Sequence, residues 1–274
     1  TALNYYLGEK LWKPGNVPCI YGRQVRRRKT FLLLAVGADV GILGVFKCLA
    51  VFVDNALLPM GLSFYIFKMI SYQMDLYRQK VPEKPGWKQA ALYFTLFPQV
   101  ESGPIMGYAQ GGFGSGKGCS LEGFEDGLKC FVAGLGMKVL LADKLAILWN
   151  DLQMIGFLMA SGLMVMLGYP FIMNFNDPYA SKSISEFYRR WHVTLGRWFR
   201  EYVYIPLGGS RCDKKRLVLN LALVWLLTGI WHGNGFNYLV WGSVIGLVII
   251  LEKLVYGKLL QKIPLLGNVY VLVL

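Results

Sequence analysis

Charged residues are scarce in this chain, and their scarcity argues against most soluble folds. Asp, Glu, Lys and Arg make up 16% of the 274 residues, whereas 55% of the residues are hydrophobic. Soluble domains carry charge on about 25% of their residues. The composition therefore favours a protein that has a lipid bilayer as its main partner.

Acidic residues are fewer than basic ones, and the formal net charge is +13. The basic residues concentrate beside apolar segments, in Arg23–Lys29 and in Lys182–Arg216. Because cytoplasmic loops of membrane proteins carry this bias, we expect both clusters to face the cytoplasm. The charge therefore does not require a nucleic-acid partner, and we expect none.

Cysteine is too sparse and too irregularly spaced to form a disulfide framework or a zinc site. The five cysteines are odd in number and form no C-x-x-C or Cys/His pattern. Those patterns are the usual signatures of a disulfide scaffold or a zinc site. We therefore expect neither a disulfide framework nor a bound metal. The residues are Cys19, Cys48, Cys119, Cys130 and Cys212.

Long apolar runs are abundant instead. A helix needs about 20 mainly apolar residues to cross a bilayer core that is about 30 Å thick. No strand-like alternation and no internal repeat occurs. The sequence predicts an all-α, polytopic integral membrane helical bundle, with residues 1–274 as a single membrane-embedded domain. The predicted spans are 31–53, 57–74, 127–149, 152–173, 217–232 and 236–251.

One apolar segment, Ala90–Met106, is interrupted by prolines and polar residues. Non-helical backbone at membrane depth survives only where protein or water covers it. We interpret the segment as a broken or re-entrant helix that lines a cavity, with Gln99 and Glu101 as candidate tunnel residues. A plain helix that ends at Pro98 is the alternative.

Ionisable residues inside the predicted spans are functional candidates, because charge is costly within a bilayer. Asp39, Lys47 and Lys68 are of this kind. They either form structural pairs or, with Glu101, line the ion path of a transporter or channel.

An arginine-rich segment contains the first of only two histidines. Ser183 and Glu186 form an S-x-x-E capping box, and aromatic residues then recur at three- and four-residue spacing. The pattern predicts an interfacial amphipathic helix over residues 183–204. His192 lies near the edge of its apolar face and is either a hydrogen-bonded structural histidine or a functional one.

The second histidine, His232, ends an apolar run that has no charged residue from Leu217 to Trp231. A helical hairpin over residues 217–251 would place His232 at its turn, with Thr228 one turn earlier on the same face. Such a histidine is costly unless it has a partner. A neutral imidazole can act as a general base near pH 7. The alternative is a structural histidine that only stabilises the hairpin turn.

Two motifs enclose these histidines, SEFYRRWHVTLGRWFREYVYIPLGG at 185–209 and GIWHGNGFNYLVWG at 229–242. Two further stretches accompany them, LPMGLSFYIFKMISYQMDLYR at 58–78 and LYFTLFPQVESGPIM at 92–106. Together they resemble the membrane-bound O-acyltransferases, and most closely the bacterial branch that acetylates exported polysaccharides, typified by alginate O-acetyltransferase. The resemblance covers nearly the whole chain.

The resemblance implies an O-acyltransferase in the bacterial cytoplasmic membrane, with several spans and no bound cofactor. The donor would be acetyl-CoA or an acyl-carrier-protein thioester. The acceptor would be a hydroxyl of an exported polysaccharide or of a periplasmic relay protein. The family's catalytic histidine falls on His232, as general base, and its second histidine on His192. Candidates for oxyanion stabilisation or donor positioning are Asn234, Asn237, Trp231 and Arg190.

The related teichoic-acid D-alanyl transferases give the alternative, in which an acyl group passes from a carrier-protein thioester to teichoic acid or lipid. Relatives also carry a longer stretch before the NFNDPY motif at Asn174–Tyr179. We therefore expect a segment to be missing near Phe157, and both ends to be cuts through a longer protein.

Overall fold

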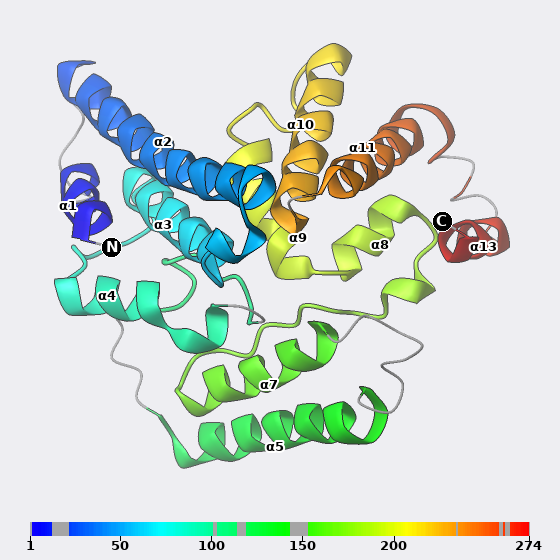
Figure 1. Cartoon of the computed structure of the whole chain (residues 1–274), viewed down its shortest axis with the longest axis horizontal. Helices are drawn as coiled ribbons and strands as arrows, with labels where there is room; N and C mark the ends of the chain where they lie inside the picture. Colours follow the sequence, from blue (N-terminus) through cyan, green and yellow to red (C-terminus); the bar gives the residue numbers. More distant parts are fainter. Residues whose placement is uncertain are drawn as a thin grey trace. The chain divides into compact units, whose positions relative to one another are not determined.

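A computed structural model describes residues 2–12, 22–100, 103–113, 119–142, 153–233, 235–257, 260 and 264–273. Within these ranges the chain forms helices and turns without a strand, which confirms the all-α prediction (Figure 1). The chain divides into two compact units, Thr1–Ile172 and Met173–Leu274. The two histidines both lie in the second unit.

The first unit consists of long and short helices in two groups. Helices α1, α2 and α3 pack on one another, and α5 packs along α7 (Figure 1). The elements are α1 (Ala2–Leu11), α2 (Gly22–Phe52), η1 (Asn55–Leu57), α3 (Leu62–Tyr77), α4 (Trp87–Thr95), η2 (Phe97–Gln99), α5 (Leu121–Met137), η3 (Lys138–Ala142) and α7 (Gln153–Met166).

Buried polar side chains connect α1, α2 and α3. Asn4 Nδ2 donates to Asp39 Oδ1 at 2.8 Å, and Gln73 Nε2 donates to the Asn4 carbonyl at 2.6 Å. Lys68 Nζ donates to the Leu96 carbonyl at 3.1 Å, just where α4 has ended. Asp39 and Lys68 therefore have structural partners, which favours structural pairing over an ion path for both.

The interrupted segment is not one continuous helix. Helix α4 ends at Thr95, a 3-10 turn follows over Phe97–Gln99, and residues 103–113 are non-helical. Proline has no N–H to donate and favours such a break. Glu101 lies outside the described residues, whereas Gln99 is buried at 1% exposure.

The second unit is built around a pair of helices, α10 and α11, that pack against each other (Figure 1). The shorter helix α8 contacts α11. Its first residue, Ile184, bonds to Glu252, which directly follows α11. The elements are η4 (Pro178–Ala180), α8 (Ile184–Arg190), α9 (Val193–Phe199), η5 (Arg200–Tyr204), α10 (Lys214–His232), α11 (Phe236–Leu251), η6 (Glu252–Tyr256) and α13 (Pro264–Val273).

The prediction of a single helix over residues 183–204 is wrong, because the helix is interrupted. Its capping box is present, because Ser183 Oγ accepts the Glu186 N–H at 3.0 Å. However, α8 ends at Arg190, and His192 has the left-handed backbone angles φ 52° and ψ 48°. A left-handed residue cannot continue a right-handed helix. The chain therefore starts a second helix, α9, at Val193.

Within the ranges that the structure describes, two helices are long and apolar enough to cross a bilayer, Val25–Phe52 and Phe236–Tyr256, and the apolar helix Gly156–Met166 is shorter. The first matches the predicted span 31–53 and the second the predicted span 236–251. The remaining predicted crossings, and the interfacial position of residues 183–204, stay predictions.

Glycines bring α10 and α11 into direct backbone contact. A Cβ atom added to Gly242 would lie 2.6 Å from the Trp225 carbonyl oxygen and 3.1 Å from the Gly229 Cα. One added to Gly246 would lie 2.8 Å from the Trp225 Cβ. Small residues at four-residue spacing permit this approach between membrane helices. The contact fixes the tryptophans on both helices near the hairpin turn.

Substitution Gly242→Leu should destabilise this hairpin. The added side chain would have to displace the backbone of α10, and such overpacking costs about 1–3 kcal/mol. We expect a lower midpoint of thermal unfolding for the detergent-purified protein, followed by tryptophan fluorescence. The control is Gly44→Ala, because a Cβ at Gly44 meets nothing within 4 Å. Equal midpoints for the two variants would contradict the close approach.

Candidate active site

His232 is the last residue of α10 and lies between two tryptophans. Its imidazole centroid is 4.7 Å from the ring of Trp231 and 4.8 Å from the ring of Trp241, both edge to face. Trp241 comes from α11, so the packing of the hairpin determines the distance between this ring and the histidine. Aromatic pairs prefer such edge-to-face geometry. The imidazole is half-buried and therefore partly accessible.

The other histidine approaches the same tryptophan. The centroid of His192 is 5.9 Å from the ring of Trp231, at an interplanar angle of 89°. The steps from His192 to Trp231 and from Trp231 to His232 are thus 5.9 and 4.7 Å. The imidazoles lie no further apart than these two steps together. The structure therefore brings together the two histidines and Trp231.

Aromatic rings connect the two histidines a second way, through α8. Successive ring centroids are 4.6 to 6.3 Å apart, within the usual range for interacting aromatic rings. The contacts close into a loop that we call the aromatic circuit. Its members are His192, Trp231, His232, Trp241, Trp225, Tyr188, Phe187, Trp191 and Phe175.

A buried loop residue, Asn174, holds the position of His192. Its carbonyl oxygen accepts the Val193 N–H at 2.9 Å, and its side-chain Oδ1 accepts the Thr194 N–H at 2.8 Å. These are the first N–H groups of α9, which have no partner within their own helix. The Asn174 Nδ2 lies 3.3 Å from His192 Nδ1. One asparagine thus starts α9 and contacts the imidazole that precedes it.

The surroundings keep His192 uncharged. Burial, with a smaller contribution from the nearby His232 imidazole, lowers its pKa from the ordinary 6.5 to about 4. His192 lies between α8 and α9, outside the two helices long enough to span a membrane. Because desolvation disfavours the charged form of a histidine, the ring is neutral at pH 7.

A carboxylate at the far end of α11 holds helix α8. Glu252 is 4% exposed, and its two oxygens accept the N–H groups of Ile184 at 2.6 Å and of Ser185 at 2.8 Å. Acidic groups at a helix N-terminus satisfy its free N–H groups and match its dipole. Glu252 therefore fixes the helix that carries Phe187 and Tyr188 into the aromatic circuit.

The remaining candidate residues take different positions. Thr228 is buried and donates to the Val224 carbonyl at 2.8 Å. Arg190 pairs with Glu186 at 2.8 Å and is thereby held on α8. Asn237 is exposed on the first turn of α11, with its side-chain oxygen against Gly235. Asn234 lies outside the described residues, and Gln99 belongs to the first unit.

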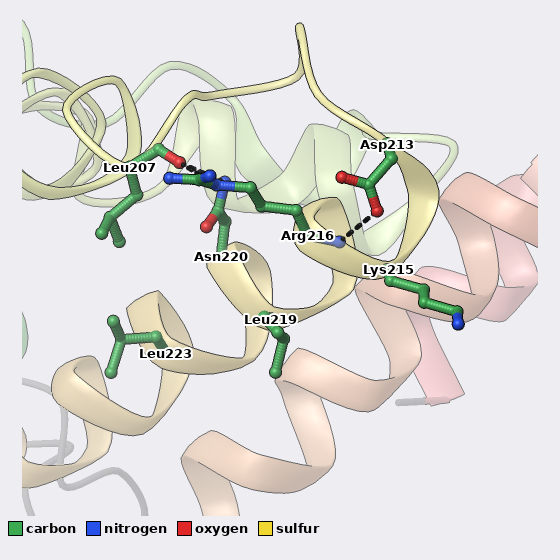
Figure 2. Close-up of a pocket in the computed structure, with 7 residues that line it drawn as sticks. All are labelled: Leu207, Asp213, Lys215, Arg216, Leu219, Asn220 and Leu223. Atoms are coloured by element: carbon green, nitrogen blue, oxygen red, sulfur yellow. Dashed lines mark hydrogen bonds between the residues drawn. The ribbon is translucent and has the colours of Figure 1, made fainter.

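An open groove of about 490 Å³ lies at the other end of α10 (Figure 2). Arg216 lies sixteen helical positions before His232, or about 24 Å away at 1.5 Å per residue. The Arg216 Nε and the Asn220 Nδ2 both donate to the Leu207 carbonyl, at 3.0 and 3.2 Å. These bonds hold the IPLGG loop on α10. The groove contains none of the predicted site residues.

Sequence reasoning missed three residues that shape this site: Asn174, Trp241 and Glu252. Glu252 had a visible signal, because it is the single carboxylate directly after the sixteen residues of α11. Asn174 and Trp241 stood within the quoted motifs. Their roles depend on contacts between distant segments, and a helical periodicity does not encode such contacts.

Residues 129–269 match the family described as membrane-bound O-acyltransferase. This match includes both histidines, Asn174 and the whole aromatic circuit. The chain belongs to the membrane-bound O-acyltransferase family.

Three curated relatives indicate the breadth of this family. The chain is 34% identical to "Probable alginate O-acetylase AlgI" of Pseudomonas putida, over 92% of this chain and 60% of that protein. It is 27% identical to a peptidoglycan O-acetyltransferase of Helicobacter pylori, over 82% and 56%. It is 29% identical to a teichoic acid D-alanyltransferase of Bacillus subtilis, over 69% and 57%.

The chain thus spans little more than half the length of these relatives. The aligned region of the Pseudomonas putida protein covers 297 positions, more than the 274 residues of this chain. That relative therefore has residues inside the matched region that this chain lacks. Their expected position near Phe157 remains a prediction, since residues 143–152 lie outside the described ranges.

Substitution Glu252→Ala should loosen α8, because two N–H groups lose their acceptor. An unsatisfied buried donor costs about 1–3 kcal/mol. We expect faster amide hydrogen exchange in peptides that contain Ile184 and Ser185, with Glu252→Gln intermediate because one oxygen remains. Val255→Ala is the control, since that side chain is 70% exposed. Unchanged exchange in Glu252→Ala would show that the carboxylate does not hold the helix.

Proposed function

We propose that this protein transfers an acyl group, most simply acetyl, from a thioester donor to a hydroxyl group, with His232 as the general base. The observation that carries the proposal is the pairing of His232 and His192 across Trp231, inside the part of the chain that matches the acyltransferase family. Both imidazoles sit among aromatic rings that exclude bulk water from much of their surface.

The proposed reaction balances within the site and its two substrates. The hydroxyl oxygen attacks the thioester carbonyl carbon, and His232 takes the hydroxyl proton as the new C–O bond forms. The tetrahedral intermediate then expels the thiolate, which breaks the C–S bond, and the proton passes from His232 to the sulfur. General base catalysis is needed because a neutral hydroxyl is a weak nucleophile. The products are an ester and a thiol.

The negative charge on the carbonyl oxygen also needs fixed hydrogen-bond donors. Removing one such donor typically costs a factor of about 10²–10³ in turnover. We retain Trp231, Asn234, Asn237 and Arg190 as candidates for this role or for holding the donor, with Thr228, Gln99 and Glu101 as candidate tunnel residues. The Arg190 guanidinium is already paired with Glu186, at 2.8 Å.

The family and its relatives support a proposal for the substrates and partners. Two relatives have names that specify O-acetylation of a polysaccharide, alginate in one and peptidoglycan in the other. We therefore propose an exported polysaccharide, or a periplasmic relay protein serving it, as the acceptor, and acetyl-CoA or an acyl carrier protein as the donor. The protein would be a multi-pass protein of the bacterial cytoplasmic membrane, with lysine and arginine clusters on the cytoplasmic side.

The relationship to a teichoic acid D-alanyltransferase supports a second candidate function. In that case the donor would be a D-alanyl carrier-protein thioester and the acceptor teichoic acid or a lipid. The same histidine chemistry applies to both donors. Radiolabelled acetyl-CoA and a radiolabelled D-alanyl carrier protein, offered separately to the purified protein in liposomes, distinguish the two functions.

Substitution His232→Gln should abolish transfer while the hairpin remains folded. Glutamine is similar in length but cannot accept a proton near pH 7, and loss of a general base lowers turnover by about 10²–10⁴. The measurement is the initial rate of acetyl transfer in proteoliposomes. Ser243→Ala is the matched control on α11, because Ser243 is exposed and bonds only the Leu239 carbonyl of its own helix, at 2.7 Å, among the described residues. Full activity in His232→Gln would exclude the proposed mechanism.

A further inference from the structure

The orientation of the Asn174 carboxamide is determined by its partners. Its Oδ1 lies 2.8 Å from the Thr194 backbone nitrogen and 2.9 Å from the Thr194 Oγ1. A backbone N–H can only donate, so the atom that faces it is the amide oxygen. The amide nitrogen therefore faces His192 Nδ1, at 3.3 Å. Exchanging the two atoms would place two donors against each other at Thr194.

This orientation determines which nitrogen of His192 carries the proton. The Asn174 Nδ2 is a donor, so the His192 Nδ1 accepts and has no hydrogen. In a neutral imidazole the hydrogen is then on Nε2. Among the described residues, Nε2 of His192 has no hydrogen-bond partner, and the side chain is half-buried. An acceptor atom that reaches the ring through its exposed part can receive this hydrogen bond.

We propose that Asn174 is a positioning residue that keeps His192 in the Nε2–H form, from which His192 donates a hydrogen bond to the carbonyl oxygen of the acyl group. This inference rests on the proposed acyl transfer. It assigns a different step of the reaction to each histidine. His232 accepts the proton of the hydroxyl group, and His192 stabilises the charge that develops on the thioester oxygen. Both rings contact the same side chain, Trp231, at 5.9 and 4.7 Å, so they lie in one part of the site.

The same asparagine also sets where the imidazole points. His192 is left-handed at φ 52°, a conformation that non-glycine residues adopt rarely and that is often found at functional sites. The hydrogen bonds from the Val193 and Thr194 N–H groups to Asn174 stabilise this break between α8 and α9. Helix capping and proton placement are therefore two separate roles of one side chain. They can be separated by substitution.

Substitution Asn174→Asp separates them, because a carboxylate has nearly the shape of the amide. It can still accept the N–H and Oγ–H of Thr194, so the start of α9 is retained. It cannot donate to His192, and it attracts a proton to Nδ1 instead. Thr194→Val is the matched control, since it removes one bond to Asn174 and leaves the bond from the backbone N–H and the amide–imidazole contact in place.

The experiment is nitrogen NMR of the protein with ¹⁵N-labelled histidine in lipid nanodiscs at pH 7. Comparison with His192→Gln assigns the signals of His192. We expect a protonated Nε2 and an unprotonated Nδ1 in the wild type and in Thr194→Val, and a protonated Nδ1 in Asn174→Asp. A protonated Nδ1 in the wild type, or a proton distribution that Asn174→Asp leaves unchanged, would overturn the assignment of Asn174.

Kinetics test the donor role in the same variants. Asn174→Asp should lower kcat for acetyl transfer by about 10²-fold with a smaller change in KM, because the lost bond strengthens only in the transition state. His192→Gln, which places an N–H near the position of Nε2, should retain more activity than His192→Ala. Wild-type turnover in Asn174→Asp would overturn the donor role, even with the expected NMR result. Activity in His232→Gln would instead count against the proposed function, and the NMR result would stand.

Discussion

The break between α8 and α9 is the feature on which the rest of the site depends. A continuous amphipathic helix would place His192 in a regular helical position, with its backbone N–H bonded to Tyr188. Asn174 prevents this by taking over the first N–H groups of α9, which leaves His192 at φ 52° between two helices. A left-handed histidine costs free energy and persists only where its surroundings over-determine it. Here the surroundings are one asparagine and a circuit of aromatic rings.

The hairpin supplies the other half of the site from the two ends of α11. Near its start, the contact between Gly242 and the backbone of α10 brings Trp241 to 4.8 Å from His232. At its end, Glu252 accepts two N–H groups of α8. Helix α11 therefore determines the position of Trp241 beside His232, and the residue after it holds α8, which leads to His192. The arrangement pre-organises the site, as electrostatic catalysis requires.

The sequence predicted the helical class and the hairpin turn, because these follow from composition and apolar length. It also singled out the two histidines as candidates, because burying an imidazole is costly. It did not predict the break at His192. Aromatic spacing continues through this residue as in one helix, and the residue that interrupts the helix, Asn174, is eighteen positions away. Glu252 was missed for a similar reason, since its partners lie 68 and 67 positions away. Periodicity reports which face is apolar, but not which distant polar group completes a helix end.

In the proposed mechanism both histidines act on one acyl group. The most direct test is a structure of the protein with a thioether analogue of acetyl-CoA, which keeps the acyl carbonyl but cannot transfer it. The account predicts that the carbonyl oxygen lies about 2.7–3.2 Å from His192 Nε2, with the His232 ring on the side from which a hydroxyl would approach. An analogue bound with its carbonyl remote from both imidazoles would contradict the account.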